Sequence, residues 1–270
     1  MKRVRKSTEP PTLTRFRVAR PNATWAEMRG DAHFGGMAAY DAVRDVACYD
    51  QGSICAYCET ELDHANPLRI RVEHFHSKGG SQVSTTNWTL LWPNMLAVCL
   101  GGGNTAMGAP FFAPPLPENL SCDAHKAHLE HIGKLNIPCA GEVLNPLDVP
   151  AYPSLFKYVH SLGALEPDPL GCAATVIAGN ACASTAELVK NTIEVFNLNC
   201  PRLCDERQRI SRAIEGNKKA ARDEGLSPGA GLARIAQRKF TRRFPPFFTT
   251  IRACLGRAGE EYLQGVQYDG

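Results

Sequence analysis

Two stretches of the chain predict strands from their pattern of apolar and polar positions. In residues 68–73, Leu-Arg-Ile-Arg-Val-Glu, every second side chain is apolar, as in a strand with one buried face. Residues 155–165 contain a short apolar run, a turn around Gly163 and a second apolar pair. That arrangement predicts a β-hairpin.

Helical patterns lie on both sides of these strands. Asn22-Ala23-Thr24 offers an N-cap, so we expect a helix over parts of 25–50, interrupted near Gly35-Gly36. In the last third of the chain, apolar residues recur every three or four positions. This spacing predicts one helix around 188–196, a second opened by Pro201, and a third over 232–243.

These elements predict an α+β protein in three parts. A basic, extended arm (1–22) precedes a domain with a strand and clustered cysteines (23–145), and a hairpin with a mostly helical domain (146–270) follows. Residues 104–121, rich in Pro, Gly and Ala, predict a long loop. A length of 270 residues fits one large domain or a compact module with a second domain.

Composition and charge narrow the possible environments. With 44% hydrophobic and 21% charged residues, the chain resembles ordinary globular proteins. Its apolar runs are far shorter than the roughly 20 residues of a membrane helix, and no apolar segment follows the basic N-terminus. We therefore expect a cytoplasmic protein with no membrane contact.

The charge distribution is uneven along the chain. Residues 1–20 carry seven Lys/Arg and one acid, residues 201–257 carry fourteen and five, and residues 21–200 carry nine and eighteen. Basic flanks suit contact with a phosphate backbone. Solvated helix faces and a loose tail are the simpler interpretation, and charge alone favours it.

Eleven cysteines without a secretory signal favour metal ligation over disulfides. Cys55 and Cys58 form a C-x-x-C pair, which suits zinc or a redox site. Redox pairs require a long helix after the motif, and Pro67 follows too soon for one. Cys99 and Cys122 can complete a four-thiolate zinc site. We expect the other cysteines to be small buried residues, although Cys200 and Cys204 could form a second pair.

Four short motifs together resemble a known family. They are Cys-Ala-Tyr-Cys-Glu from Cys55, Glu-His-Phe from Glu73, Asn-Met-Leu-Ala-Val-Cys-Leu-Gly-Gly from Asn94, and Cys-Asp-Ala-His-Lys from Cys122. This series resembles HNH (ββα-metal) endonucleases. More narrowly, it is similar to PtuB, the HNH subunit of Septu-type anti-phage systems, which also occurs beside some retrons. The resemblance is strong over 55–126 and weaker beyond.

The resemblance implies specific roles for the residues at matching positions. It implies a ββα-metal core held by a structural Zn²⁺ on the four cysteines, with a catalytic Mg²⁺ or Mn²⁺ on Glu73 and Asp123. His74 matches the general base, and Asn94 matches the residue that braces the loop carrying that base. His125, and Lys126 beside it, are candidates for phosphate contact, and His125 also for replacing a carboxylate ligand.

Three departures from the simplest pattern affect mainly the metal ligands. The last two cysteines are separated by 22 residues instead of two, Glu73 replaces the commoner Asp, and Asp123 stands where Asn or His is frequent. The pairing of those two cysteines therefore depends on the resemblance and not on their spacing.

The resemblance also implies a substrate and partners. The substrate would be DNA or RNA, and the partners a PtuA-like ATPase that controls the nuclease, together with a retron reverse transcriptase and its nucleic acid. The alternative is a non-catalytic, zinc-stapled subunit for nucleic-acid binding or assembly. The intact Glu-His, Asn and Asp positions argue against that alternative.

Overall fold

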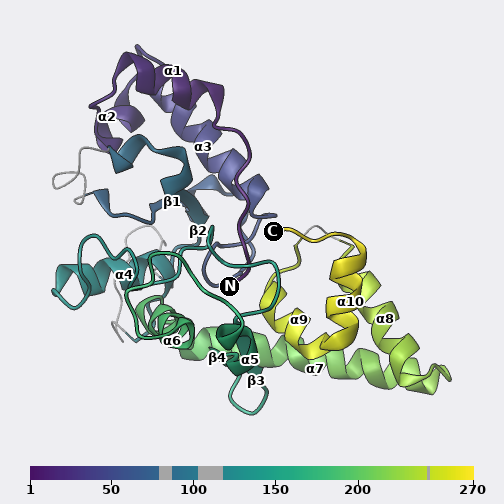
Figure 1. Cartoon of the computed structure of the whole chain (residues 1–270). Coiled ribbons are helices and arrows are strands. Elements are labelled where there is room, and N and C mark those ends of the chain that lie inside the picture. Colours follow the sequence, from purple (N-terminus) through teal and green to yellow (C-terminus); the bar gives the residue numbers. More distant parts are fainter. Residues whose placement is uncertain (79–86, 103–117, 242–243) are drawn as a thin grey trace.

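A computed structural model describes residues 1–78, 87–102, 118–241 and 244–270 (Figure 1). Most of the loop expected at 104–121 therefore lies outside the described residues. The described helices are α1 (Pro11–Ala19), α2 (Trp25–Gly30), α3 (Gly36–Asp50), α4 (Cys122–His131), α5 (Pro169–Ala173), α6 (Thr185–Val195), α7 (Pro201–Asp223), α8 (Pro228–Lys239), α9 (Phe248–Leu255) and α10 (Arg257–Gly265). The strands are β1 (Arg71–His74), β2 (Met95–Val98), β3 (Phe156–Val159) and β4 (Ala164–Pro167), and short 3-10 turns are η1 (Pro67–Arg69), η3 (Trp88–Leu90) and η4 (Trp92–Asn94).

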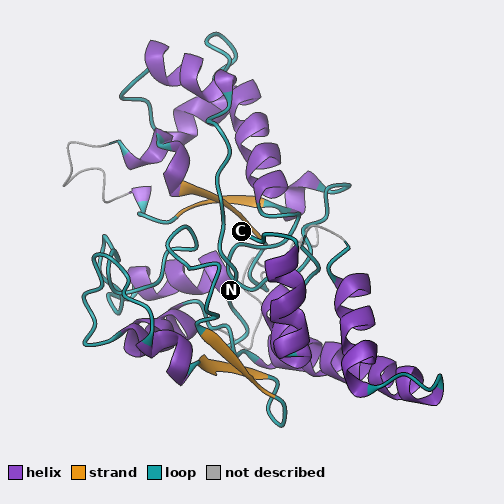
Figure 2. Cartoon of the chain, turned by 45° about the vertical axis from the view of Figure 1, so that its right-hand side comes forward, coloured by secondary structure: helices purple, strands orange, loops and turns teal. Residues whose placement is uncertain are grey.

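The described strands form two antiparallel hairpins (Figure 2). Strand β1 pairs with β2 so that His74 lies opposite Met95. The strand expected over 68–73 begins later than predicted, because residues 67–69 form the turn η1. The second hairpin, β3–β4, confirms the one predicted at 155–165.

The N-terminal segment differs from the extended arm that the sequence predicted. Pro11 opens helix α1 at a position where its missing N–H costs nothing, and Leu13 is buried beneath the helix. Residues before the helix also pack against the core. Lys6 Nζ donates to the Met95 carbonyl (2.7 Å) and lies 3.1 Å from the centre of a Trp92 ring. The segment therefore supports the β1–β2 hairpin.

The interrupted helix over 25–50 is confirmed. Thr24 caps α2 in a reciprocal capping box with Glu27. Gly35, at φ +80°, then precedes α3. A side chain at Gly36 would place its Cβ 2.2 Å from the Met28 carbonyl oxygen, so close packing of α2 on α3 requires glycine at that position.

The C-terminal helices follow the predicted order and add two more. Pro201 opens α7 as expected, and α8 begins at Pro228, four residues before the predicted start. Helices α9 and α10 were not predicted. Helices α8 and α9 both contact α7, and α10 packs on α8 and α9, so the four form one cluster at one end of the molecule, away from α1–α3 (Figures 1 and 2).

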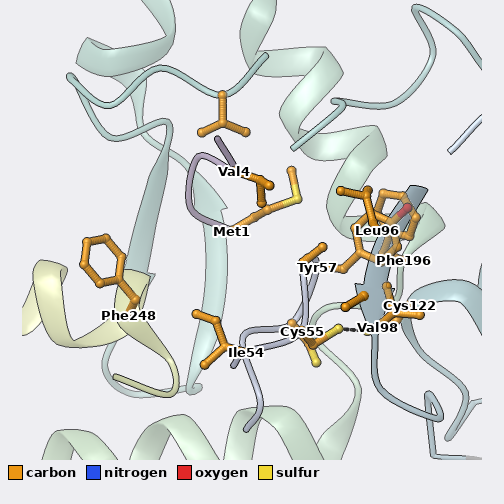
Figure 3. Packing of buried hydrophobic residues seen from close by; sticks show 14 of the residues in the cluster. Met1, Val4, Ile54, Cys55, Tyr57, Leu96, Val98, Cys122, Phe196 and Phe248 are labelled. Atoms are coloured by element: carbon orange, nitrogen blue, oxygen red, sulfur yellow. Dashed lines mark hydrogen bonds between the residues drawn. The ribbon is translucent and has the colours of Figure 1, made fainter. Parts of the chain in front are cut away.

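A continuous hydrophobic core joins both ends of the chain. The Tyr57 ring stacks on Phe196 with centroids 3.9 Å apart, which connects the cysteine-bearing turn to the end of α6 (Figure 3). Glu59, also in that turn, accepts hydrogen bonds from the Thr249 backbone N–H (2.8 Å) and hydroxyl (2.6 Å). The turn is therefore attached to α9 as well. In the described residues, no helix has the length and apolarity that a membrane crossing requires.

Candidate metal centre and active site

The structure brings Cys55, Cys58, Cys99 and Cys122 together. Their sulfur atoms all lie within 4.8 Å of one another, with separations of 3.8 Å for Cys55–Cys122, 3.6 Å for Cys58–Cys99 and 3.8 Å for Cys99–Cys122. A tetrahedral Zn²⁺ with Zn–S bonds of about 2.3 Å requires sulfurs about 3.8 Å apart. The four side chains therefore fit one zinc ion.

Distant parts of the chain supply these sulfurs. Cys55 and Cys58 come from the tight turn after α3, Cys99 directly follows β2, and Cys122 begins α4. Cys122 has a left-handed backbone, φ +55°, a conformation that is uncommon for residues other than glycine. Its N–H donates to the Phe196 carbonyl (2.8 Å). Packing against α6 therefore holds Cys122 in the orientation that the cluster needs.

Polar groups surround the sulfur cluster. Gly101 N–H donates to Cys99 Sγ (3.4 Å), and the Ser121 hydroxyl donates to Cys122 Sγ (3.5 Å). The Arg202 guanidinium donates to the Ser121 hydroxyl. Burial alone lowers the pKa of Arg202, but the nearby cysteine sulfurs outweigh it and raise that pKa. These donors and this cation suit the negative charge of a zinc–thiolate centre.

The other cysteines take no part in a comparable group. Among the described residues, the set of four is the single group of three or more His, Cys, Asp or Glu ligands. Cys200 is buried and Cys204 is half-buried, and neither belongs to it. The remaining five are buried except Cys182, which is half-buried.

His74, the candidate base, ends β1 in a buried position. Its Nε2 lies 3.0 Å from the Thr89 backbone carbonyl. Because a carbonyl only accepts, Nε2 carries the proton and Nδ1 carries the lone pair. Nδ1 is buried and has no partner among the described residues. Burial, together with the Lys78 charge, lowers the pKa of His74 to about 3, so the ring is neutral at pH 7.

The Asn94 side chain connects the two segments on either side of His74. Its Oδ1 accepts from the His76 N–H (2.7 Å), and its Nδ2 donates to the carbonyls of His76 (3.0 Å) and Trp88 (2.9 Å). The residue is buried at the end of η4, directly before β2. It thus holds both the segment after His74 and the segment containing Thr89, whose carbonyl orients the imidazole.

Glu73 and Asp123 form an acidic pair between β1 and α4. Burial and the charge of Asp123 raise the pKa of Glu73 well above its usual range. Burial alone would also raise the pKa of Asp123. The hydrogen bond with Glu73 and the positive charge of Arg71 together outweigh burial and lower that pKa. Two neighbouring carboxyl groups are a suitable donor set for a hard divalent cation.

Lys126 does not reach a substrate surface, in contrast to the expected phosphate contact. Its ammonium is buried and donates to Glu73 Oε1 (2.7 Å) and to the carbonyls of His74 (3.0 Å) and Phe75 (2.8 Å). These acceptors saturate its three N–H groups. Burial alone lowers the pKa of Lys126, but the charge of Glu73 reverses this effect and raises it. Lys126 therefore fixes the position of Glu73.

His125 faces away from the acidic pair. Its Nδ1 lies 2.8 Å from the Val195 carbonyl at the end of α6, so this nitrogen donates its proton there. The ring is half-buried, and burial lowers its pKa. The hydrogen bond assigns His125 to the contact between α4 and α6. Its role in catalysis stays a prediction.

A cavity of about 400 Å³ opens beside the acidic pair. Glu73 and Asp123 line it together with four cationic side chains, Arg29, Arg44, Arg71 and Lys78. Sequence reasoning missed the three arginines. Arg71 could have been found, because it lies two positions before Glu73 and so faces the same side of a strand. Nothing in the sequence connects Arg29 or Arg44 to this place.

No profile of a known protein family matches the chain. A protein of Escherichia coli that is named as an HNH endonuclease of retron Ec83 is similar to it, with 43% identity over 211 residues. The similar region covers 78% of this chain and 79% of that protein. The similarity therefore extends over most of both chains.

Proposed function

Because this chain belongs to the HNH endonuclease family and is a nuclease, we propose that it hydrolyses phosphodiester bonds in DNA, with RNA as the second candidate substrate. The observation that carries the proposal is the environment of His74. Its Nε2–H is bonded to a carbonyl, while its Nδ1 lone pair has no partner among the described residues. A neutral imidazole with an unbonded lone pair can accept a proton from a water molecule that reaches it.

The residues around His74 support this role. The Thr89 carbonyl holds the imidazole in the tautomer that leaves Nδ1 unprotonated, and it also accepts from Nε2–H when the ring becomes charged. Trp25 packs edge-on against the ring with centroids 4.5 Å apart, which limits rotation. Asn94 braces the two neighbouring segments. His74 is therefore oriented before a substrate arrives, which lowers the cost of reaching the transition state.

Glu73 and Asp123 would hold one Mg²⁺ or Mn²⁺ through carboxylate oxygens, the donors that these ions prefer. When bound, such an ion polarises the phosphate and stabilises charge on the leaving oxygen. The four cysteines would hold a Zn²⁺ that contributes to folding only. We assign β1, β2 and α4 to the ββα-metal core within residues 23–145, with residues 146–270 as the hairpin and helical domain.

We place the nuclease in an anti-phage defence complex in the cytoplasm. The name of the similar E. coli protein associates it with a retron, and the motifs over 55–126 resemble Septu PtuB. On this proposal an ATPase subunit similar to PtuA controls cleavage. A retron reverse transcriptase with its nucleic acid is a further candidate partner.

The test compares cleavage by the wild type and by His74→Ala in Mg²⁺ and in Mn²⁺, with the chain expressed together with its neighbouring genes. We expect the variant to lose about 10²- to 10⁴-fold in rate, with an unchanged circular dichroism spectrum. His131→Ala, an exposed position on α4, is the matched control and should cut normally. Equal cleavage by wild type and His74→Ala would reject His74 as the base.

A further inference from the structure

The cavity beside the acidic pair has more positive than negative side chains. Four cationic residues, Arg29, Arg44, Arg71 and Lys78, and two carboxylates line it. The walls come from β1 and α4 on one side and from α2 and α3 on the other. A divalent cation on the carboxylates would make the excess larger. The natural ligand of such a cavity is a polyanion.

Arg71 lies within reach of the proposed metal ligands. It is two positions before Glu73 on β1, so both side chains leave the same face of the strand. Its Nη1 is 3.5 Å from Asp123 Oδ2. A guanidinium has five N–H donors in a planar fork that matches a phosphate. The Arg71 side chain is 25% exposed and lines the cavity together with Asp123, so it can contact an anion bound at the acidic pair.

Arg29 and Arg44 differ although both come from the opposite wall. Arg44 donates to Asp45 (2.9 Å) and pairs with Asp41 (3.0 Å), so its charge is already balanced. Within the described ranges, Arg29 has no carboxylate partner, and its guanidinium lies 5.0 Å from the centre of the Tyr40 ring. The aromatic ring supports the guanidinium without neutralising it. Arg29 is thus the better phosphate ligand on this wall.

We propose that Arg71 and Arg29 bind two phosphates of the strand that is cut. Arg71 contacts the phosphate at which the bond breaks, and Arg29 contacts a neighbouring phosphate on the same strand. This inference deepens the proposed nuclease function and depends on it. Arg71 would stabilise the charge that develops during hydrolysis, whereas Arg29 would contribute mainly to binding.

The two roles predict separable effects. We measure binding of a fluorescein-labelled DNA duplex and its single strand in the His74→Ala background, which leaves the DNA intact, over a range of salt concentrations. Arg29→Ala should weaken binding and reduce the slope of log Kd against log salt by about 1. In the otherwise wild-type chain, Arg71→Ala should lower the cleavage rate at saturating DNA by about 10²-fold. Arg71→Lys should keep most of the salt slope and only part of the rate.

A metal titration distinguishes this role from a structural one. Removing a cation 3.5 Å from Asp123 makes the site more attractive to a divalent ion. Arg71→Ala without DNA should therefore bind Mn²⁺ at least as tightly as the wild type while cutting more slowly. A change that merely disordered the acidic pair would weaken Mn²⁺ binding and cleavage together.

The matched control is Arg257→Ala on α10, whose side chain is 92% exposed and pairs with Glu261. If the wild type cuts and both cavity variants behave like this control, the inference is wrong and the nuclease proposal survives. Weaker Mn²⁺ binding by Arg71→Ala would also overturn the inference. A folded, zinc-loaded wild type that neither binds nor cuts DNA or RNA of the same sequence would reject both proposals.

Discussion

The sulfur cluster and the acidic pair are neighbours that differ in almost every physical respect. Consecutive residues at the start of α4 belong to different sites, Cys122 to the sulfurs and Asp123 to the carboxylates. Three of the four cysteines are buried residues, and all four sulfurs lie within 4.8 Å of one another. The carboxylates instead face a cavity and each contacts a cation, Lys126 for Glu73 and Arg71 for Asp123.

This difference separates stability from chemistry. A closed set of four donors leaves no position for water or substrate, so an ion bound there can only stabilise the fold. An open pair of oxygens leaves positions for a phosphate and a water molecule. The first turn of α4 thus contributes to both groups. Substitutions in the sulfur cluster should affect stability, whereas substitutions in the acidic pair should affect the chemistry.

The largest effect is expected from Cys58→Ser. Structural zinc sites contribute apparent binding energies of about 10–16 kcal/mol, so loss of one thiolate should cost about 5 kcal/mol or more. We expect loss of zinc by metal analysis and loss of the cooperative thermal transition. Cys182→Ser, at a half-buried cysteine outside the cluster, should keep both. A zinc-free wild type would contradict the four-cysteine assignment.

Asn94→Ala should disturb the segments around His74 more than the sulfur cluster. The change removes three hydrogen bonds of a buried side chain, which predicts a loss of about 2–4 kcal/mol in the free energy of unfolding. Denaturant titration measures this loss in unfolding free energy, and the zinc content should not change. Asn87→Ala removes bonds that are partly exposed and should cost less. Equal losses would mean that Asn94 has no special bracing role.

Asp123→Ala should weaken the hard-metal site without affecting the zinc. Loss of one of two carboxylates predicts a decrease of about 10- to 100-fold in Mn²⁺ affinity by calorimetry. Zinc content and the melting temperature should stay close to those of the wild type. Because Cys122 is the adjacent residue, release of zinc by this variant would show that the two sites are not separable.

The last prediction concerns the pH dependence of stability and Lys6 under the β1–β2 hairpin. Burial, opposed by the charge of Asp50, lowers the pKa of Lys6 from 10.5 to about 7. Between those values the unfolded chain binds more protons, so unfolding free energy should rise with pH by up to about 1.4 kcal/mol per unit. Lys6→Met should lack this rise between pH 7 and pH 10.5, whereas Lys190→Met, at an exposed side chain, should keep it. Parallel curves for wild type and Lys6→Met would contradict the lowered pKa of Lys6.

Sequence patterns predicted the elements whose signals are local. The capping residue Thr24, the turn at Gly163 and the proline that opens α7 all act within a few positions. Helix α9 was missed for a physical reason. Seven of its eight residues are buried, so it lacks the polar face that makes an amphipathic helix recognisable.

The site was predictable where a short motif contains the chemistry, and not where distant elements meet. Glu73 and His74 are adjacent in sequence, and the family resemblance made both candidates. Cys99 and Cys122 could be joined only through that resemblance, because their spacing is uninformative. The burial of Lys126 and the approach of Arg29 from α2 depend on packing between elements, which periodicity does not encode.

The hydrogen bonds of Glu59 with Thr249 affect the order in which parts of the molecule unfold. Residue 59 directly follows Cys58 of the sulfur cluster, and its carboxylate holds the first turn of α9 through Thr249. Loss of zinc should therefore release amide protection in α9 before it does so in α1, although α9 is 190 residues away in sequence from Glu59. Hydrogen exchange during slow chelation would reveal such a sequence of opening steps.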